Sequence, residues 1–235
     1  MKVRLSVLVA TAAAAAALVG CSSSDQNSGP DAATLIQDSA TAMRDVTSAH
    51  IVLTAHGRVP NLKVTELQAD VATKPATVGS GEVTLQMGAD KTQSAKVVFT
   101  DGHLYSDIAE PGTFTDYGQG NSIYNLSVIL DPQKGLANAL ATLRDPKTEG
   151  SEDIDGTPAT KISGTSSTND VAQLAGAKLA PEKEQTVPVT VWIAQSDPHY
   201  LLKAEITPKP GTDVTLTLSD FGKQVTVTKP AVTNP

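Results

Sequence analysis

The sequence predicts an α+β domain in which an antiparallel sheet accounts for most of the chain and helices interrupt it only a few times. Apolar residues recur at every second position in segments such as the one with Ile51, Leu53 and Ala55, a pattern typical of half-buried strands. Asp101-Gly102 separates two such apolar runs and predicts a tight hairpin between antiparallel neighbours. We count roughly ten strands and three helices, which favours hairpins over alternating βαβ units.

The three helices are predicted from apolar residues spaced three and four apart. The first covers about 31–47, the second follows Asp131-Pro132, and the third begins at Thr168 or Asn169. The glycine-rich polar segment from Glu110 to Asn121 is expected to be a loop.

A single antiparallel sheet of this many strands must curl or split, because strand twist accumulates across it. Curling creates a concave face, and two interpretations of that face stay open. Either side chains fill the interior completely, or the helices fill it only in part and an apolar cavity remains. Aromatic residues make up only 3% of the chain, so aliphatic side chains must form the interior, and these suit acyl chains better than polar metabolites.

The composition argues against several functional classes. Eighteen Lys plus Arg stand against twenty-five Asp plus Glu, with a net charge of -7, whereas nucleic-acid binding needs clustered cations. One cysteine excludes a disulfide framework and a Cys-based zinc site. The sequence has no Gly-x-Ser-x-Gly elbow and no His-Glu-x-x-His helix. We therefore expect no enzymatic activity, no metal and no cofactor; a hydrolase with an unrecognised site is the weaker alternative.

The first twenty residues predict secretion. Lys2 and Arg4 precede an uncharged, alanine-rich run over 5–19 that ends just before Gly20-Cys21, the layout of a signal peptide. That run is marginal for crossing about 30 Å of hydrocarbon. Leu18-Val19-Gly20-Cys21 resembles the lipobox of bacterial lipoproteins, which implies that Cys21 carries diacylglycerol and begins the mature chain. The alternative is that Cys21 is unmodified and lies by chance beside an ordinary signal peptide.

The chain is thus predicted to have four regions: a signal peptide over 1–20, an acylated Cys21 with a flexible tether over 21–30, a single domain over 31–230 and a tail over 231–235. The tether cannot reach beyond about 30 Å. The domain is therefore expected to work close to the outer side of the cell membrane or within the envelope, with a surface or secreted fraction.

Six segments of the mature chain carry a family resemblance: Val59-Pro60-Asn61-Leu62, Thr100-Asp101-Gly102-His103-Leu104-Tyr105-Ser106-Asp107, Ser122-Ile123-Tyr124-Asn125, Leu130-Asp131-Pro132-Gln133-Lys134-Gly135-Leu136-Ala137-Asn138, Pro188-Val189-Thr190-Val191-Trp192-Ile193 and Gly222-Lys223-Gln224-Val225. Together they resemble the mycobacterial lipoprotein family that includes LppX, LprG, LprA and LprF, and the details are most similar to LprA. The resemblance extends from Cys21 to Pro230.

The resemblance implies a strongly bent antiparallel half-barrel with helices on its concave face enclosing an apolar cavity. It also implies acylated lipids or glycolipids as ligands: phosphatidylinositol mannosides, lipoglycans or triacylglycerol. Family members are agonists of host Toll-like receptor 2, and one of them works with a membrane exporter. The family's cavity position corresponds to Val83, and the expected lining adds residues of three strands and two helices: Leu85, Met87, Leu53, Val97, Phe99, Leu35, Met43, Leu136 and Leu140.

The sequence therefore predicts an envelope lipoprotein that binds acylated lipids in an apolar cavity and carries or presents them across the periplasmic space. The rival hypothesis is an acylated surface antigen or scaffold, recognised through its N-terminus, whose domain carries no lipid. An apolar cavity in the interior would favour the carrier, and an interior filled by side chains would favour the scaffold.

Overall fold

The computed structural model describes residues 31–59, 62–88, 91–123, 126–174 and 184–233. The predicted signal peptide and tether lie outside the described residues. The strands are β1 Ser48–His56, β2 Val64–Ala72, β3 Val78–Gln86, β4 Thr92–Thr100, β5 His103–Glu110, β6 Thr113–Gln119, β7 Arg144–Ile154, β8 Thr157–Ser167, β9 Thr186–Ala194, β10 Leu201–Lys209 and β11 Thr212–Ser219. The helices are α1 Ala32–Arg44, α2 Gly120–Ile123, α3 Leu136–Ala141 and α4 Thr168–Leu174, with one 3-10 turn, η1 Leu126–Val128.

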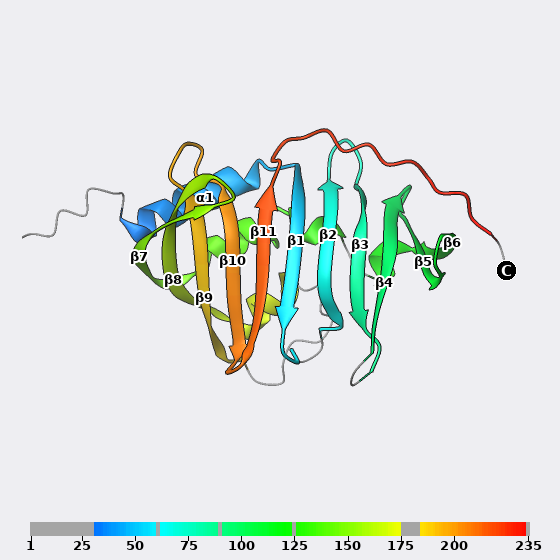
Figure 1. Cartoon of the computed structure of the whole chain (residues 1–235). Helices are drawn as coiled ribbons and strands as arrows, with labels where there is room; N and C mark the ends of the chain where they lie inside the picture. Colours follow the sequence, from blue (N-terminus) through cyan, green and yellow to red (C-terminus); the bar gives the residue numbers. More distant parts are fainter. Residues whose placement is uncertain (1–30, 60–61, 89–90, 124–125, 175–183, 234–235) are drawn as a thin grey trace, which may run out of the picture.

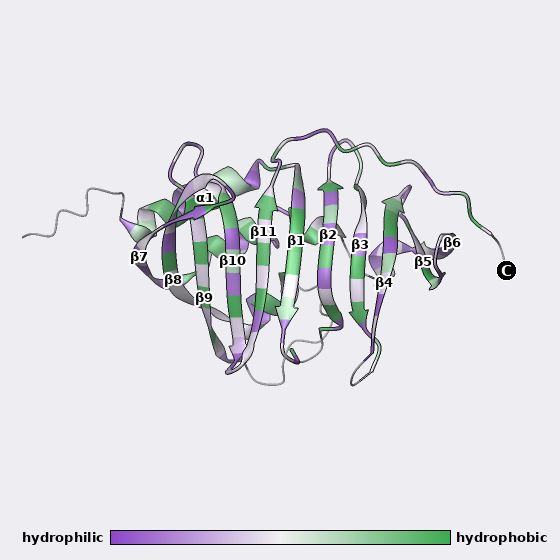
Figure 2. Ribbon diagram, viewed as in Figure 1, coloured by the Kyte–Doolittle hydropathy of each residue, from purple (hydrophilic) through white to green (hydrophobic). Residues whose placement is uncertain are grey.

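All eleven strands form one antiparallel sheet in the order β6-β5-β4-β3-β2-β1-β11-β10-β9-β8-β7 (Figure 1). The sheet is strongly curved and unclosed, with β6 and β7 at its two edges, which confirms the predicted α+β class. Its middle is the pairing of β1 with β11, where Leu53 lies opposite Leu216. The first and last strands therefore meet, and the two halves of the chain extend to either side. Figure 2 shows hydrophobic and hydrophilic residues alternating along these central strands, as the period of a strand requires.

α1, α3 and α4 pack on the concave face over the half of the sheet that contains β7 to β10, whereas η1 contacts β2 and α2 contacts β5 and β6. α1 contacts α3, β7 and β9, and Figure 1 shows it behind the strands of that half. The apolar residues of its buried side are Ala32, Leu35, Ile36, Ala40 and Met43. They join a core cluster that includes these residues of α3 and the sheet: Leu136, Leu140, Ile51, Ile162, Ile193 and Leu218.

The predicted helix ends differ from the observed ones for local reasons. α1 ends at Arg44, before the predicted residue 47, because Ser48 already begins β1. α3 begins only at Leu136: the Asp131 carboxylate accepts hydrogen bonds from the backbone N–H groups of Gln133 and Lys134, at 2.8 and 2.9 Å, and so closes a turn instead of capping a helix. α4 begins at Thr168, as predicted.

Two Asp-Gly pairs form the tight turns predicted for them. Asp101 and Gly102 have φ angles of 54° and 78° between β4 and β5, and Asp155 and Gly156 have 49° and 85° between β7 and β8. Two successive positive φ angles define the turn type whose twist matches that of the flanking strands.

The polar segment from Glu110 to Asn121 is not a loop, so that expectation is wrong. It contains the β5–β6 turn, β6 and the start of α2. The Asp107 carboxylate accepts hydrogen bonds from the backbone N–H groups of Gly112, at 2.9 Å, and Lys96, at 2.7 Å. It thereby ties the turn to β4. The Gly112 bond is the main reason why the pKa of Asp107 is lowered from its usual value.

The C-terminal segment crosses one end of the sheet and reaches the far edge (Figure 1). The backbone N–H of Gly222 donates to the Ser48 carbonyl oxygen, and the Lys229 ammonium lies 5.5 Å from the ring centroid of Tyr105. Val232 then forms a parallel bridge with Phe114 of β6. Contacts of the domain therefore extend past residue 230, into the predicted tail.

The backbone of β2 approaches Gly81 so closely that a side chain has no room there. A Cβ atom would lie 2.1 Å from the Gln68 carbonyl oxygen and 2.6 Å from Ala69 Cα, both backbone atoms of β2. Gly88 follows the same strand, and its Cβ would meet nothing within 4 Å. The two glycines offer a matched test of this close approach.

We expect Gly81→Ala to lower the free energy of unfolding by about 2 kcal/mol or more, because strand backbone must move to admit the methyl group. Gly88→Ala should change it by less than about 0.5 kcal/mol. Urea unfolding followed by circular dichroism measures both. Equal effects of the two substitutions would contradict the close approach of β2 to Gly81.

We expect Asp107→Asn to cost about 1–2 kcal/mol at pH 7, since it weakens two buried charge-assisted hydrogen bonds. The folded-state pKa of Asp107 is lowered, so its contribution is complete above about pH 4 and is lost as the pH falls through that lowered pKa. The difference between wild type and variant should therefore narrow only below about pH 4. The exposed Asp38 on α1, changed to Asn, is the control. A difference that stays constant from pH 7 to pH 2 would refute this assignment.

Candidate apolar binding face

An apolar row crosses the concave face at the centre of the sheet. Leu216 of β11 lies opposite Leu53, Leu53 opposite Leu67 of β2, and Leu67 opposite Val83 of β3. Leu53 is two residues from Ile51, which belongs to the helix-covered core, so the row faces the same side as the helices. We call Leu216, Leu53, Leu67 and Val83 the apolar row.

Burial changes along these strands from one end of the sheet to the other. Ala49 and Ile51 of β1 and Val71 of β2 are 2%, 0% and 0% exposed. Leu53 and the rest of the apolar row keep partial exposure, as does Leu85, two residues beyond Val83. The concave face is therefore closed near the start of β1, and an aliphatic surface stays accessible toward its end.

The ten predicted lining residues fall into three groups. Five are buried, in the helices and on β4: Leu35, Met43, Leu136, Leu140 and Phe99. Four sheet residues are only partly buried: Leu53, Val83, Leu85 and Val97. Met87 lies beyond the last residue of β3 and is 57% exposed. The strand alternation that placed Met87 beside Leu85 was extended too far, because β3 ends at Gln86.

The helix residues of the predicted lining and Phe99 do not belong to one cluster. Leu35, Met43, Leu136 and Leu140 pack together in the main core. Phe99 packs instead against α2, where its ring carbons lie within 2.7 Å of the position that a Cβ of Gly120 would take. That contact requires the glycine. The two groups therefore bury different parts of the concave face.

Leu67 and Leu216 were absent from the predicted lining, although the alternation identified both as strand residues. They join the site through pairing of β1 with β2 and β11. The β1–β11 pairing joins the two ends of the domain, and no local pattern signals it. The β1–β2 neighbour relation, by contrast, was available from consecutive strands.

The convex face carries polar groups with partners of their own. His50 Nδ1 lies 2.7 Å from Asp70 Oδ1, and His56 Nδ1 lies 3.0 Å from Asp213 Oδ2. Among the described residues, no three His, Cys, Asp or Glu side chains gather as a metal site would require. These pairs lie on the face opposite the apolar row and contribute nothing to it.

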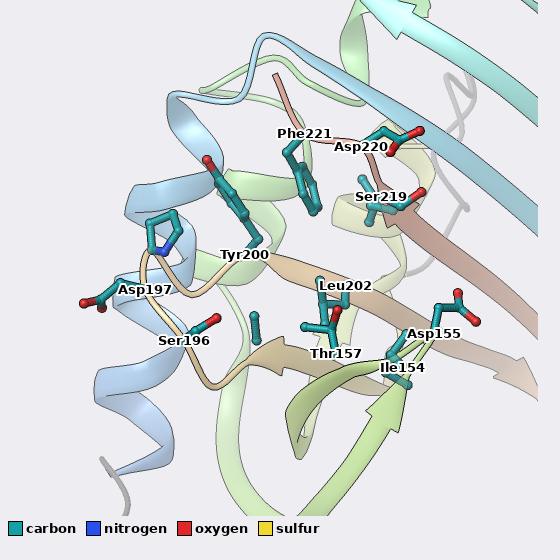
Figure 3. Close-up of a pocket in the computed structure, with 13 residues that line it drawn as sticks. Ile154, Asp155, Thr157, Ser196, Asp197, Tyr200, Leu202, Ser219, Asp220 and Phe221 are labelled. Carbon is teal, nitrogen blue, oxygen red and sulfur yellow. The ribbon is translucent and has the colours of Figure 1, made fainter. Parts of the chain in front are cut away.

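A small pocket lies away from the apolar row, near the turns β7–β8 and β9–β10. Its volume is about 260 Å³, and its wall includes Tyr200 and Phe221, whose rings stack with centroids 4.3 Å apart. Figure 3 shows Asp155, Asp197 and Asp220 around it. Ligand pockets usually measure about 300–1,000 Å³, so this one is too small and too acidic at its rim to hold acyl chains.

The comparisons with known proteins agree with this architecture. The profile of the LppX_LprAFG lipoprotein family matches residues 31–227, which is nearly the whole described domain. The chain belongs to this family. Lipoprotein LprA of Mycobacterium tuberculosis is 53% identical over 200 residues, which cover 85% of this chain and 82% of LprA. The lipoarabinomannan carrier protein LprG of Mycolicibacterium smegmatis is 42% identical over 229 residues, 96% of this chain and 95% of LprG.

Solved structures of two family members share the fold. LprF from Mycobacterium bovis superimposes with a TM-score of 0.76 at 26% identity, over 85% of this chain and 97% of LprF. LppX from Mycobacterium tuberculosis superimposes with a TM-score of 0.61 at 25% identity, over 83% of this chain and 97% of LppX. The family is one of lipoproteins, which indicates association with the cell envelope. Within the described residues no helix is long and apolar enough to span a bilayer.

The closed core and the accessible row should respond differently to truncation. Leu35→Ala, in the closed core, should lower the free energy of unfolding by about 2–5 kcal/mol. Leu53→Ala removes the same atoms from a half-buried position and should cost less than about 1.5 kcal/mol. Urea unfolding of both variants provides the comparison. Equal losses would mean that the apolar row is as tightly packed as the core.

Proposed function

We propose that this lipoprotein binds acylated lipids against the apolar row and carries them through the cell envelope without chemical conversion. One observation supports the proposal above all: four aliphatic side chains on adjacent strands stay partly exposed on the concave face, beside a core that is otherwise closed. Buried aliphatic side chains need no ligand, whereas exposed ones arranged in a continuous row gain from covering by hydrocarbon.

Transfer of a lipid between membrane and protein needs no energy source in this scheme. Each methylene group kept out of water is worth about 0.8 kcal/mol, in a bilayer or against Leu and Val side chains alike. The exchange is therefore nearly balanced and is driven by the supply of lipid on either side. Neither a catalytic group nor a cofactor takes part.

The lipid class proposed is an acylated glycolipid or lipoglycan, such as a phosphatidylinositol mannoside; triacylglycerol is the uncharged alternative. The support is the similarity to LprG, a lipoarabinomannan carrier protein, together with the aliphatic character of the row. An exporter in the membrane and host Toll-like receptor 2 stay predictions from the family resemblance.

Cys21 is proposed to carry the acyl anchor. It is the one cysteine of the chain and follows Leu18-Val19-Gly20 directly. Acyl chains at this position would hold the domain on the extracytoplasmic side of the membrane. The tether of residues 22–30 would then hold the start of the domain within about 30 Å of the anchor. The apolar row could lie farther from the anchor only by the width of the domain.

The test is a bulky residue in the apolar row. Val83→Trp should lower the amount of lipid that copurifies from a mycobacterial host by about tenfold, because the indole occupies the space of an acyl chain. Native mass spectrometry of the chain with Cys21→Ser measures bound lipid apart from the anchor. Glu82→Trp is the matched control, since it places the same side chain on the opposite, solvent-exposed face of β3.

Circular dichroism should show the same fold for both tryptophan variants. Undiminished lipid in Val83→Trp, or no lipid in the parent chain, would leave the scaffold hypothesis as the better one. Mass spectra of the chain that retains Cys21 should show a diacylglyceryl adduct, which Cys21→Ser removes.

A further inference from the structure

Four cations lie together at one end of the half-barrel. The β1–β2, β3–β4 and β10–β11 connections all leave the sheet at the end drawn lowest in Figure 1. They carry Arg58, Lys63, Lys91 and Lys209, and all four residues are exposed. We call these four residues the basic end. These residues lie at the lower end (Figure 1) of the strands in the middle of the strand order, β10, β11, β1, β2 and β3.

The opposite end of the sheet carries mostly carboxylates. Its connections include five aspartates: Asp45, Asp101, Asp155, Asp197 and Asp220. Three cations, Arg44, Lys74 and Lys223, are also there, and Lys223 is paired with Asp220 at 2.9 Å. The molecule is therefore polarised along its strands even though its net charge is negative.

The cations of the basic end are available to a partner. None of the ion pairs found among the described residues involves them. Of the acidic residues nearby, Asp213 is paired with His56 at 3.0 Å, and the exposed Glu66 lies on β2 three residues from Lys63. Glu110 lies further along at the β5–β6 turn, and Asp90 lies outside the described residues. The four cations thus present an excess of positive charge at this end.

An apolar group accompanies the cations. Met87, the first residue of the β3–β4 connection that also carries Lys91, is 57% exposed. The accessible part of the apolar row also points this way: burial decreases from Ile51 to Leu53 along β1, which ends where Arg58 follows. The open stretch of the concave face and the basic end therefore share one end of the molecule.

We propose that the basic end is a docking surface for an anionic membrane, on which it sets the open stretch of the apolar row. Lys and Arg side chains would contact phosphate groups, and Met87 would insert among them. The exchange of lipid that docking would serve rests on the proposed function, but docking itself requires no bound lipid. The acidic opposite end would point away from the bilayer.

Charge complementarity favours a membrane surface as the occupant over a protein groove. Each Lys or Arg close to an anionic bilayer strengthens binding about fivefold at physiological salt, and the effect falls off within about 8 Å. The end with an excess of cations gains from this attraction, whereas the five aspartates of the other end are repelled. The two ends together therefore orient the domain as well as attract it.

Sedimentation with sucrose-loaded vesicles tests the attraction. We would use the full chain with Cys21→Ser and compare vesicles of phosphatidylcholine alone with an equal mixture of phosphatidylglycerol and phosphatidylcholine. Lys63→Glu together with Lys91→Glu should weaken binding to the anionic vesicles at least about 25-fold and leave binding to the neutral ones unchanged. All variants share residues 1–30, so any membrane affinity of that segment cancels in the comparison.

The matched control is Lys74→Glu together with Lys223→Glu, which alters net charge equally at the opposite end. It should weaken binding about threefold or less, since those side chains lie more than a Debye length from the bilayer. Equal losses for the two double variants, or no preference of the parent for anionic vesicles, would overturn the proposal.

A fluorescent probe tests the orientation. Met87→Cys in the chain with Cys21→Ser provides a single thiol for an environment-sensitive label, and Lys74→Cys provides one at the other end. On anionic vesicles, spin-labelled lipid should quench the label at residue 87 and not the one at residue 74. Quenching at both or at neither would refute a docked end. These readouts involve no lipid cargo, so their failure is distinct from a failure of Val83→Trp to reduce lipid loading.

Discussion

A mismatch between the width of the sheet and the length of its helices governs this structure. Eleven strands spaced about 4.8 Å apart span roughly 48 Å around the curve, whereas the 13 residues of α1 extend about 20 Å. α3 has only six residues. α1 and α3 can therefore close only one half of the concave face, around Leu35 and Ile51. α2 covers Phe99 toward the other edge, and the apolar row between the two stays partly exposed. The proposed lipid-binding role follows from that uncovered surface.

Much of the fold was predictable from local patterns. The Asp-Gly pairs gave both hairpin turns because few dipeptides tolerate two positive φ angles, and the apolar spacing of α1 gave its buried side. The hairpin of β5 and β6 was missed, since its turn is held by Asp107, a polar residue whose partners Lys96 and Gly112 are not apparent in the sequence.

The sequence was sufficient to predict which face of the sheet carries the candidate site, but not which residues belong to it. Alternation places Leu53 and Val83 on one face, yet it cannot tell which apolar residues the helices will cover. The family resemblance supplied Val83, while Leu216 entered only through the β1–β11 pairing. The polarity of the two ends was hidden for the same reason: Lys63 and Lys209 lie far apart in the chain, and topology alone brings their turns to one end.

An open sheet has two margins whose unpaired backbone groups could recruit a strand from a neighbouring molecule. The two edge strands, β6 and β7, differ in what limits such pairing. At β6 its own C-terminus supplies a partner, through Val232 and Phe114. At β7 nearly every residue is exposed and many are charged, among them Lys147 and Glu149. Both margins therefore offer fewer free backbone groups or less apolar surface to a strand of a neighbouring molecule, and the segment around Val232 covers part of β6.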